Sequence, residues 1–283
     1  MQTARELEVL RKAVDTLRGD GATIALVPTM GALHEGHLTL MREARHAADH
    51  VVASIFVNPR QFGEGEDLDA YPRQLARDSE LLEKEGVALL WAPQPQEVYP
   101  QGYATNISVA GVSEGLCGGD RPGHFDGVAT VVCKLFNQVR PDIGFFGEKD
   151  WQQLAVIRRM ARDLDLTQPN VDAIRGVPIV REEDGLAMSS RNAYLSSKQR
   201  EQAGALPRAM RDAIAVLSEG GEAERPLGNL REVLQVSGFD SVDYAELRDA
   251  DSLEPLEKDN GNARLFVAAR IGGTRLIDNM AVE

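Results

Sequence analysis

The chain has 283 residues, 43% of them hydrophobic and 27% charged, so it is long enough to fold around a substantial core without disulfide bonds. Its 31 basic and 44 acidic residues give a net charge of −13 at pH 7, which argues against a nucleic-acid partner because such proteins usually present a basic face. Cys117 and Cys133 are the only cysteines, and no apolar run is long enough for a membrane span or a signal peptide, so we expect a cytoplasmic protein with no membrane partner.

The first third of the chain predicts alternating helices and strands. Apolar residues at helical spacing indicate an amphipathic helix over residues 5–18. A strand at 23–27, a helix at 38–44 and a strand at 50–57 then form a βαβ unit of a parallel sheet. A helix at 72–85 and a strand at 87–91 continue this alternation.

The loop after the first of these strands is the most informative stretch, and it reads Pro-Thr-Met-Gly-Ala-Leu-His-Glu-Gly-His from residue 28. Pro28 and Gly31 exclude regular structure, and His34 and His37 point to the same side of a first helical turn. Free backbone N–H groups and the helix dipole favour an anion there, and in particular a phosphate. A half-built metal site and an ordinary helix cap are the alternatives, although the metalloprotease pattern requires three residues between its histidines.

The next strand ends in a polar turn, Asn58-Pro59-Arg60-Gln61-Phe62-Gly63. Because the carboxyl ends of parallel strands share one edge of a sheet, Gln61 should lie at the same rim as the histidines. A loop of this composition is also typical of a plain turn. The acidic segment 64–69 that follows reads as a solvated loop with no assigned role.

The middle of the chain predicts an irregular region over 93–103, a strand over 106–112 and a helix that Asp126 caps. The loop between this strand and this helix carries Arg121 and His124. These two cationic side chains either close over a ligand or belong to a simple connector, and their roles stay open.

Two further junctions carry charged and hydroxyl groups. A strand-to-helix turn over 141–154 presents Lys149, which could compensate phosphate charge, and Asp150, which could bind a ribose hydroxyl or cap the helix. A strand over 176–181 leads to a Met-Ser-Ser-Arg loop at 188–191, whose two hydroxyls and one guanidinium suit a triphosphate.

The character of the chain then changes. Helices are expected over 197–218 and 227–236, with strands near 242–247, 264–269 and 275–278. We therefore predict an α/β protein with a Rossmann-like, doubly wound parallel sheet in residues 1–175 and a smaller C-terminal α+β domain in residues 176–283. The Met-Ser-Ser-Arg loop lies at the hinge between them.

Taken together, these motifs resemble the pantothenate synthetase (pantoate–β-alanine ligase) family, of the HxGH nucleotidylyltransferase and class I synthetase-like superfamily. The likeness rests on the His-Glu-Gly-His loop and on four further stretches in the same order: Val-Asn-Pro-Arg-Gln-Phe, Arg-Pro-Gly-His-Phe-Asp-Gly-Val, Phe-Gly-Glu-Lys-Asp-Trp-Gln-Gln-Leu and Asp-Gly-Leu-Ala-Met-Ser-Ser-Arg-Asn. It implies that ATP adenylates pantoate with release of pyrophosphate, and that β-alanine then displaces AMP to give pantothenate.

The resemblance also implies site residues. His37 is the proposed proton donor, with His34 and Lys149 beside it as catalytic groups, and Gln61 and Gln153 hold pantoate and β-alanine. The implied ATP-binding residues are Met30, Gly31, Ala32, Leu33, His34, Glu35, Gly36, His37, Gly147, Glu148, Lys149, Asp150, Val180, Met188, Ser189, Ser190 and Arg191. One departure from the wider superfamily is that Ala187 and Ser190 occupy the lysine positions of the synthetase Lys-Met-Ser-Lys-Ser loop.

The implied cofactor is ATP with Mg²⁺ as a substrate complex, held by phosphate oxygens and water, with no protein metal site and no tightly bound prosthetic group. The implied assembly is a homodimer. Two rival functions stay open: a nucleotidylyltransferase that keeps the nucleotide in its product, and a regulatory module that binds ATP without turnover. The small second domain, which lacks a basic stripe, argues against a tRNA-charging enzyme.

Overall fold

The computed structural model describes residues 1–63, 66 and 68–282, and the chain divides into two compact units. The first unit comprises Met1–Ser113, Arg121–Glu148 and Gln153–Pro178. The second comprises Glu114–Asp120, Lys149–Gln152 and Ile179–Glu283. The division into domains 1–175 and 176–283 stays a prediction.

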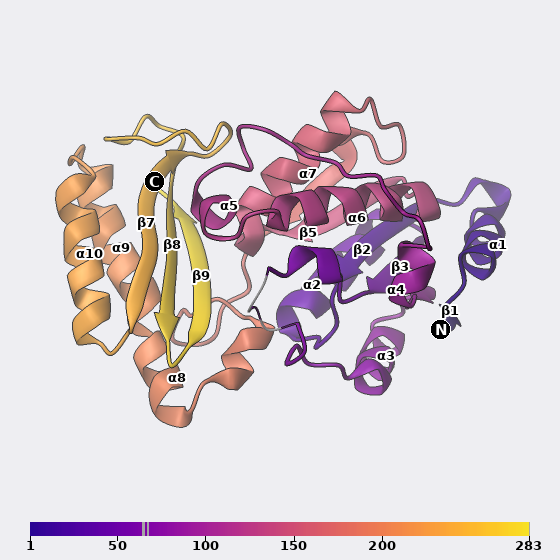
Figure 1. Ribbon diagram of the computed structural model, residues 1–283, viewed down its shortest axis with the longest axis horizontal. Coiled ribbons are helices and arrows are strands. Elements are labelled where there is room, and N and C mark those ends of the chain that lie inside the picture. The colour runs from indigo at the N-terminus through magenta and orange to yellow at the C-terminus, as the bar shows by residue number, and fades with distance from the viewer. Residues whose placement is uncertain (64–65, 67, 283) are drawn as a thin grey trace. The chain divides into compact units, whose positions relative to one another are not determined.

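The first unit is built on a six-stranded parallel sheet with the order β1-β4-β3-β2-β5-β6 (Figure 1). Its strands are β1 (Gln2–Ala4), β2 (Ile24–Thr29), β3 (His50–Ile55), β4 (Leu89–Trp91), β5 (Ile143–Gly147) and β6 (Ile174–Val177). Their cores are continuous apolar runs, as expected for strands that are buried on both faces. The predicted α/β, doubly wound fold is confirmed, and the order of the strands reverses between β2 and β5.

Helices cover both faces of this sheet (Figure 1). On one face, Leu40 and Met41 of α2 (Glu35–Ala47) pack with Ala25 and Val27 of β2, and α3 (Leu75–Lys84) joins the same cluster through Leu82. On the other face lie α1 (Leu7–Leu17) and α6 (His124–Val139). The remaining helices of the part of the chain that the structure describes are α4 (Pro95–Val98), α5 (Leu116–Asp120) and α7 (Trp151–Asp163) before residue 179.

The second unit has an antiparallel sheet of β7 (Ser241–Asp249), β8 (Ala263–Ile271) and β9 (Thr274–Ala281), in that order. Helices α8 (Ser197–Ala203), α9 (Ala205–Ser218) and α10 (Glu224–Val236) form a core with this sheet that includes Leu206, Met210, Leu230, Leu265 and Val267. The predicted α+β character is confirmed. The single helix predicted over 197–218 is wrong, because Pro207 has no N–H to donate to the turn before it and the helix breaks at Gly204.

Two other local predictions are wrong. No strand forms over 106–112; Ile107 N instead donates to Thr130 Oγ1 of α6, at 3.0 Å. Asp126 lies inside α6 rather than at its cap, which is Gly123. The Asp126 carboxylate accepts hydrogen bonds from Asn106 and Ser108, so it fastens this segment to the helix.

The strand predicted over 176–181 is misplaced as well. β6 ends at Val177 because Pro178 cannot donate to a neighbouring strand. Arg181 instead forms an isolated antiparallel bridge with Ala187. The short strand β1 was missed, since three residues are too few to show a period.

Helix α6 lies against the short 3₁₀ turn Pro59–Gln61 that follows β3. A Cβ atom at Gly127 would overlap the Arg60 carbonyl and would lie 2.9 Å from Gln61 N. Only glycine allows this approach of helix and turn, so Gly127 determines where Gln61 is placed.

We therefore expect Gly127→Ala to lower the free energy of unfolding by about 1–3 kcal/mol, the usual cost of overpacking. Gly228→Ala is the matched control, because Gly228 also lies inside a helix and nothing lies within 4 Å of a Cβ there. The control should be as stable as the wild type or more stable. Urea unfolding followed by circular dichroism measures both, and equal stability of the two variants would contradict this account of the packing.

Candidate functional site

Topology places two of the sequence junctions at one edge of the first unit. The strand order reverses between β2 and β5, and in open parallel sheets ligands bind beyond the carboxyl ends of the strands at such a switch point. The Met30–His37 loop follows β2, and Gly147 ends β5. The motif selected from the sequence therefore lies where the fold favours a ligand.

The two histidines of this loop are adjacent but not equivalent. His34 is the extended N-cap residue of α2, whereas His37 lies in its first turn, and their ring centroids are 4.1 Å apart. His34 N donates to His37 Nδ1 at 3.3 Å. A neutral His37 ring that accepts at Nδ1 carries its proton on Nε2, so it presents an N–H donor beside the N-terminus of the helix.

Gln61 is held by the turn that follows β3. Asn58, which is fully buried, donates from Nδ2 to Gln61 Oε1 at 2.9 Å and to Gly127 O at 3.1 Å. Because the oxygen of the Gln61 amide is engaged as an acceptor, its nitrogen presents two N–H donors. Gln61 is only 8% exposed, so the orientation of its amide is set by this contact.

Tyr99, which the sequence analysis missed, fixes the orientation of the Asn58 amide and through it that of the Gln61 amide. The Tyr99 hydroxyl donates to Asn58 Oδ1 at 2.9 Å, which determines which end of the Asn58 amide is the donor. Burial raises the pKa of Tyr99 to about 12, so the phenol stays a donor throughout the neutral range. Tyr99 ends the short helix α4, in the stretch 93–103 that the sequence wrongly predicted to be irregular throughout, and this position gave no signal in the sequence.

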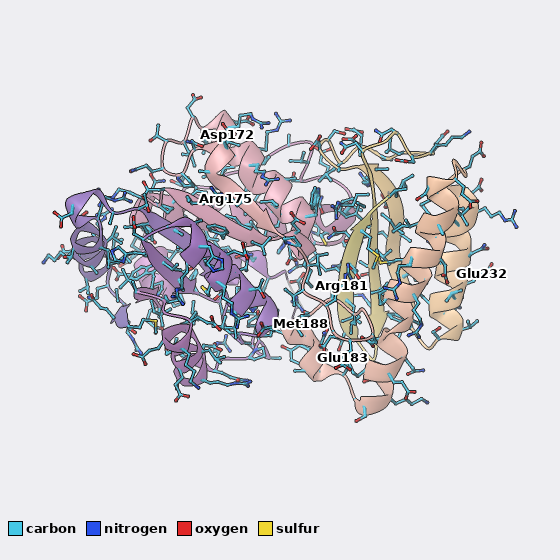
Figure 2. The ribbon with its side chains drawn as sticks, turned by 180° about the vertical axis from the view of Figure 1, so that it is seen from behind. Asp172, Arg175, Arg181, Glu183, Met188 and Glu232 are labelled. Atoms are coloured by element: carbon cyan, nitrogen blue, oxygen red, sulfur yellow. The ribbon has the colours of Figure 1, made fainter. Side chains whose placement is uncertain are left out.

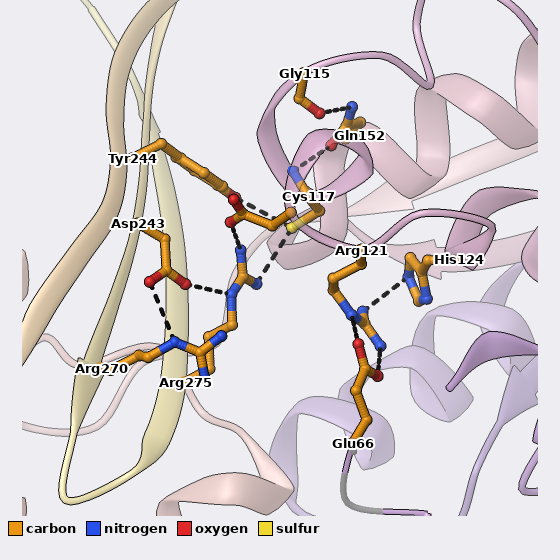
Figure 3. A network of polar contacts seen from close by, with 11 residues as sticks. Glu66, Gly115, Cys117, Arg121, His124, Gln152, Asp243, Tyr244, Arg270 and Arg275 are labelled. Carbon is orange, nitrogen blue, oxygen red and sulfur yellow. Dashed lines mark hydrogen bonds and ion pairs between the residues drawn. The ribbon is translucent and has the colours of Figure 1, made fainter. Parts of the chain in front are cut away.

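The main chain of Gln61 is held from a second side by Arg121 and His124. Figure 3 shows these two side chains together with Glu66. His124 Nδ1 lies 2.8 Å from the Gln61 carbonyl oxygen, and Arg121 Nη2 donates to the same oxygen at 3.1 Å. Arg121 also pairs with Glu66 at 2.6 Å, and this contact lowers the pKa of the Glu66 carboxyl. Both side chains thus position Gln61. Of the acidic segment 64–69, residues 64, 65 and 67 lie outside the described residues.

The Lys149–Gln152 segment belongs to the second unit. Asn279 of β9 donates to the Lys149 carbonyl at 3.0 Å, and Trp151 Nε1 donates to Ala250 O at 2.8 Å. The Arg264 guanidinium lies over the Trp151 ring, 3.7 Å from its centroid. These contacts fix the main chain on both sides of Asp150, and Lys149 Nζ itself lies 3.8 Å from the Asp150 carboxylate.

Helix α5 is bound to the same unit (Figure 3). Gln152 Oε1 accepts from Cys117 N at 3.0 Å, and Cys117 Sγ lies 3.1 Å from the Tyr244 hydroxyl. Arg275 pairs with Asp120 at 2.8 Å. Burial raises the pKa of Tyr244, which keeps this hydroxyl protonated. Gln152 is therefore a structural residue, and its neighbour Gln153 belongs to the first unit.

Val180 and the Met-Ser-Ser-Arg loop also belong to the second unit. Figure 2 labels Arg181 and Met188, the first residue of this loop. Met188 N donates to Val180 O at 3.0 Å, next to the bridge between Arg181 and Ala187. Arg181 forms two bonds with the Asp278 carboxylate, at 2.7 and 2.9 Å, and the Asp278 side chain is 0% exposed. Burial raises the pKa of Asp278, while Arg181 opposes that shift.

Hydrogen bonds within the Met-Ser-Ser-Arg loop and its flanking residues hold its conformation. Ser189 Oγ accepts from Arg191 N at 3.2 Å and caps the short helical segment Ser190–Tyr194. Asn192 Nδ2 donates to Ala187 O at 3.2 Å, which closes the base of the loop. The Ser189 hydroxyl hydrogen can still be donated to a ligand.

The residues predicted for the site fall into two sets. Those placed in the first unit are Met30–His37, Gln61, Gly147, Glu148 and Gln153. Those placed in the second unit are Lys149, Asp150, Val180, Met188, Ser189, Ser190 and Arg191. Their common role at one nucleotide stays a prediction.

Among the described residues, no group of three or more His, Cys, Asp or Glu side chains is placed to hold a metal ion. Within the same residues, none of the helices combines the length and the apolar character that a membrane span needs.

Fold and motif define a class: a doubly wound α/β protein with a His-x-Gly-His loop at its switch point, as in nucleotidylyltransferases and class I synthetases. A comparison with known families is more specific. The family described as pantoate-beta-alanine ligase matches residues 2–281, and the chain belongs to this family.

Individual relatives agree with this assignment. The chain is similar to a pantothenate synthetase of Novosphingobium aromaticivorans, with 69% identity over 100% of this chain and 99% of the relative. Among solved structures it resembles pantothenate synthetase from Thermus thermophilus, with a TM-score of 0.92, 47% identity and coverage of 100% and 99% of the two chains. It also resembles a pantoate-beta-alanine ligase from Francisella tularensis complexed with beta-gamma ATP and beta-alanine, with a TM-score of 0.84, 32% identity and coverage of 99% and 97%.

The buried ion pair of the second unit gives a testable pH dependence. Arg181→Met should lower the free energy of unfolding by about 3–5 kcal/mol near neutral pH, because it leaves the Asp278 carboxylate buried and unpaired. A carboxyl with a raised folded-state pKa favours folding most below its unfolded pKa and loses that contribution as the pH rises through the folded value. The deficit of the variant should therefore shrink as the pH falls toward the ordinary value of 3.8.

Two controls accompany this measurement by denaturant unfolding at several pH values. Arg181→Met combined with Asp278→Asn should recover much of the loss and remove its pH dependence. Arg159→Met removes an exposed pair, Arg159 with Asp163 at 3.8 Å, and should change little. A deficit for Arg181→Met that does not vary with pH would refute the assignment of the buried charge.

Proposed function

We propose that this chain joins pantoate to β-alanine at the expense of ATP, through a pantoyl adenylate, and releases pyrophosphate and AMP. The observation that carries the proposal is the His34–His37 pair at the N-terminus of α2, at the switch point of the sheet, in a chain of the pantoate-beta-alanine ligase family. The solved relative that holds beta-gamma ATP and beta-alanine supports the choice of substrates.

In the first step a carboxylate oxygen of pantoate attacks the α-phosphorus of ATP, and the bond to the bridging oxygen breaks to release pyrophosphate. The reaction needs alignment and neutralisation of growing negative charge rather than a protein nucleophile. The N–H groups of the first turn of α2 and the Nε2–H of His37 are donors suited to that charge. His34 lies beside His37 on the same phosphates in this proposal.

In the second step the amine of β-alanine attacks the acyl carbon, and AMP leaves with the oxygen that came from pantoate. Gln61 and Gln153 are proposed to hold pantoate through neutral amides, which bond hydroxyls and carboxylates without forming an ion pair. Because Asn58 engages the oxygen of the Gln61 amide, the N–H₂ group of Gln61 is the donor that fits this task.

The nucleotide is proposed to contact Met30–His37, Gly147, Glu148, Lys149, Asp150, Val180 and Met188–Arg191. In this proposal Lys149 neutralises phosphate charge, Asp150 accepts from the ribose, and the loop ending at Arg191 closes on the leaving pyrophosphate.

Three finer proposals accompany this reaction. Mg²⁺ arrives with ATP and is held mostly by phosphate oxygens and water, because phosphate-bound Mg²⁺ needs few protein ligands. The protein works as a homodimer, as family likeness suggests. It works in the cytoplasm, which its two free thiols, Cys117 and Cys133, support.

A product assay tests the proposed function. ATP, Mg²⁺, pantoate and β-alanine should yield equal amounts of AMP, pyrophosphate and pantothenate. With ¹⁸O in the carboxylate of pantoate, one labelled oxygen should appear in AMP, since the adenylate passes that oxygen to phosphorus. Formation of ADP, retention of the nucleotide in the product, or ATP binding without turnover would each contradict the proposal, and each points to a different rival.

We expect His37→Ala to reduce kcat for pyrophosphate release by about 100-fold or more, as loss of a transition-state donor does, while the fold is retained. Gln61→Ala is the comparison variant, and its main effect should be a higher KM for pantoate. Steady-state kinetics for each substrate, with circular dichroism as a check on folding, separates the two. Pyrophosphate release by His37→Ala at the wild-type rate would remove this histidine from the mechanism.

A further inference from the structure

A buried carboxylate on α3 holds the loop that connects β2 to α2. Asp78 is 1% exposed, and its two oxygens accept hydrogen bonds from consecutive backbone groups. Ala32 N donates to Oδ2 and Leu33 N donates to Oδ1, each at 2.9 Å. The main chain just before the two histidines is therefore clamped by a residue that lies 46 and 45 positions further along the chain.

The clamped conformation is one that the chain does not adopt by itself. Gly31 has φ +85° and Ala32 has φ +50°, so two consecutive residues lie in the left-handed region. For alanine this conformation costs on the order of 1 kcal/mol and persists only where the surroundings hold it. A Cβ at Gly31 would lie 3.0 Å from Asp78 Oδ2 and 3.1 Å from Ile55 Cγ2, so glycine is needed for the carboxylate to come this close.

The contact requires a side chain with two acceptor oxygens. Both Ala32 N and Leu33 N are donors, and each takes a different oxygen of Asp78. Asp78 also lies in the first turn of α3, where the helix dipole favours negative charge. An asparagine would match one donor and turn its own N–H₂ toward the other, so even this isosteric change breaks the clamp.

The clamp leads directly to the histidine pair. Leu33 precedes His34, whose backbone N–H is the donor to His37 Nδ1. We propose that Asp78 is a positioning residue: by holding Ala32 and Leu33 it places the His34 N–H, which in turn fixes His37 with Nε2–H toward the reacting phosphate. This inference rests on the role of His37 in the proposed function.

The test compares Asp78→Asn with wild type in two measurements. The kcat for pyrophosphate release per folded molecule should fall about 10-fold to 100-fold, the usual effect of misplacing a reacting group by a fraction of an ångström, while KM for ATP changes less. The ¹⁵N chemical shifts of the His37 ring, read above its titration range, should show a proton on Nε2 alone in the wild type. In the variant they should show a mixture of tautomers, an effect that a general loss of stability does not produce.

Asp142→Asn is the matched control. Asp142 also accepts from the backbone and lies next to the other end of β2, where it binds Ile24 N at 2.7 Å and pairs with Arg18 at 2.9 Å. This control should keep both kcat and the His37 tautomer even though it loses stability. If Asp78→Asn does not fold, Asp78→Glu replaces it, because glutamate keeps the charge but moves it along by one methylene.

The outcomes are separable. A folded Asp78 variant with wild-type kcat and an unchanged His37 spectrum overturns the proposal, as does an equal change in Asp142→Asn. If the wild-type protein releases no pyrophosphate from ATP and pantoate, the proposed function fails, whereas the tautomer comparison still decides whether Asp78 orients the ring.

Discussion

The central strand of a parallel sheet cannot turn straight back at its carboxyl end, and the site depends on this constraint. β2 lies between β3 and β5, both parallel to it, so the chain must leave the sheet after Thr29 and return through a crossover helix. The bend at Gly31 and Ala32 makes that exit within a few residues, and α2 then begins at the rim of the sheet, where the positive end of its dipole lies. The proposed anion-binding position is a geometric result of how this strand ends.

Several side chains hydrogen-bond to the backbone around the proposed site and hold it in place. The carbonyl of Gln61 is bound by His124 and Arg121, and the carbonyl of Lys149 by Asn279. Each bond satisfies a main-chain group and removes a degree of freedom from the residue that is proposed to meet the substrate. Sites of this kind hold a few reacting groups in place with a larger number of groups that never touch the substrate.

The sequence revealed what is local and missed what is distant. The His34–His37 spacing and the glycine-containing turns could be identified because their signals lie within one loop, and so could the alternation that gives the parallel sheet. Asn279 gave no signal, because its role depends on a partner about 130 positions away in the chain. The role of Tyr99 could not be predicted from the sequence either, since its partner Asn58 lies on another element.

The strand wrongly predicted over 106–112 also shows that a local pattern does not identify a distant partner. Ile107 and Val109 alternate with exposed neighbours, as an edge strand would, and the pattern is correct for a half-buried extended segment. Its backbone, however, is bound by α6 through Thr130 rather than by a strand. Periodicity reports which side of a segment is buried, but not what buries it.

The charge of the chain also shapes how it can bind anions. Its net charge is −13, and several arginines of the two units are engaged by carboxylates, as in Arg121 with Glu66, Arg181 with Asp278 and Arg275 with Asp120. Much of the proposed phosphate and carboxylate recognition therefore rests on neutral donors: the N–H groups of a helix end, an imidazole, two glutamine amides and serine hydroxyls. Such donors are oriented in advance, so they stabilise charge as it develops. They also hold anionic products less tightly than a ring of unpaired cations would, which suits a reaction that must release both pyrophosphate and AMP in each cycle.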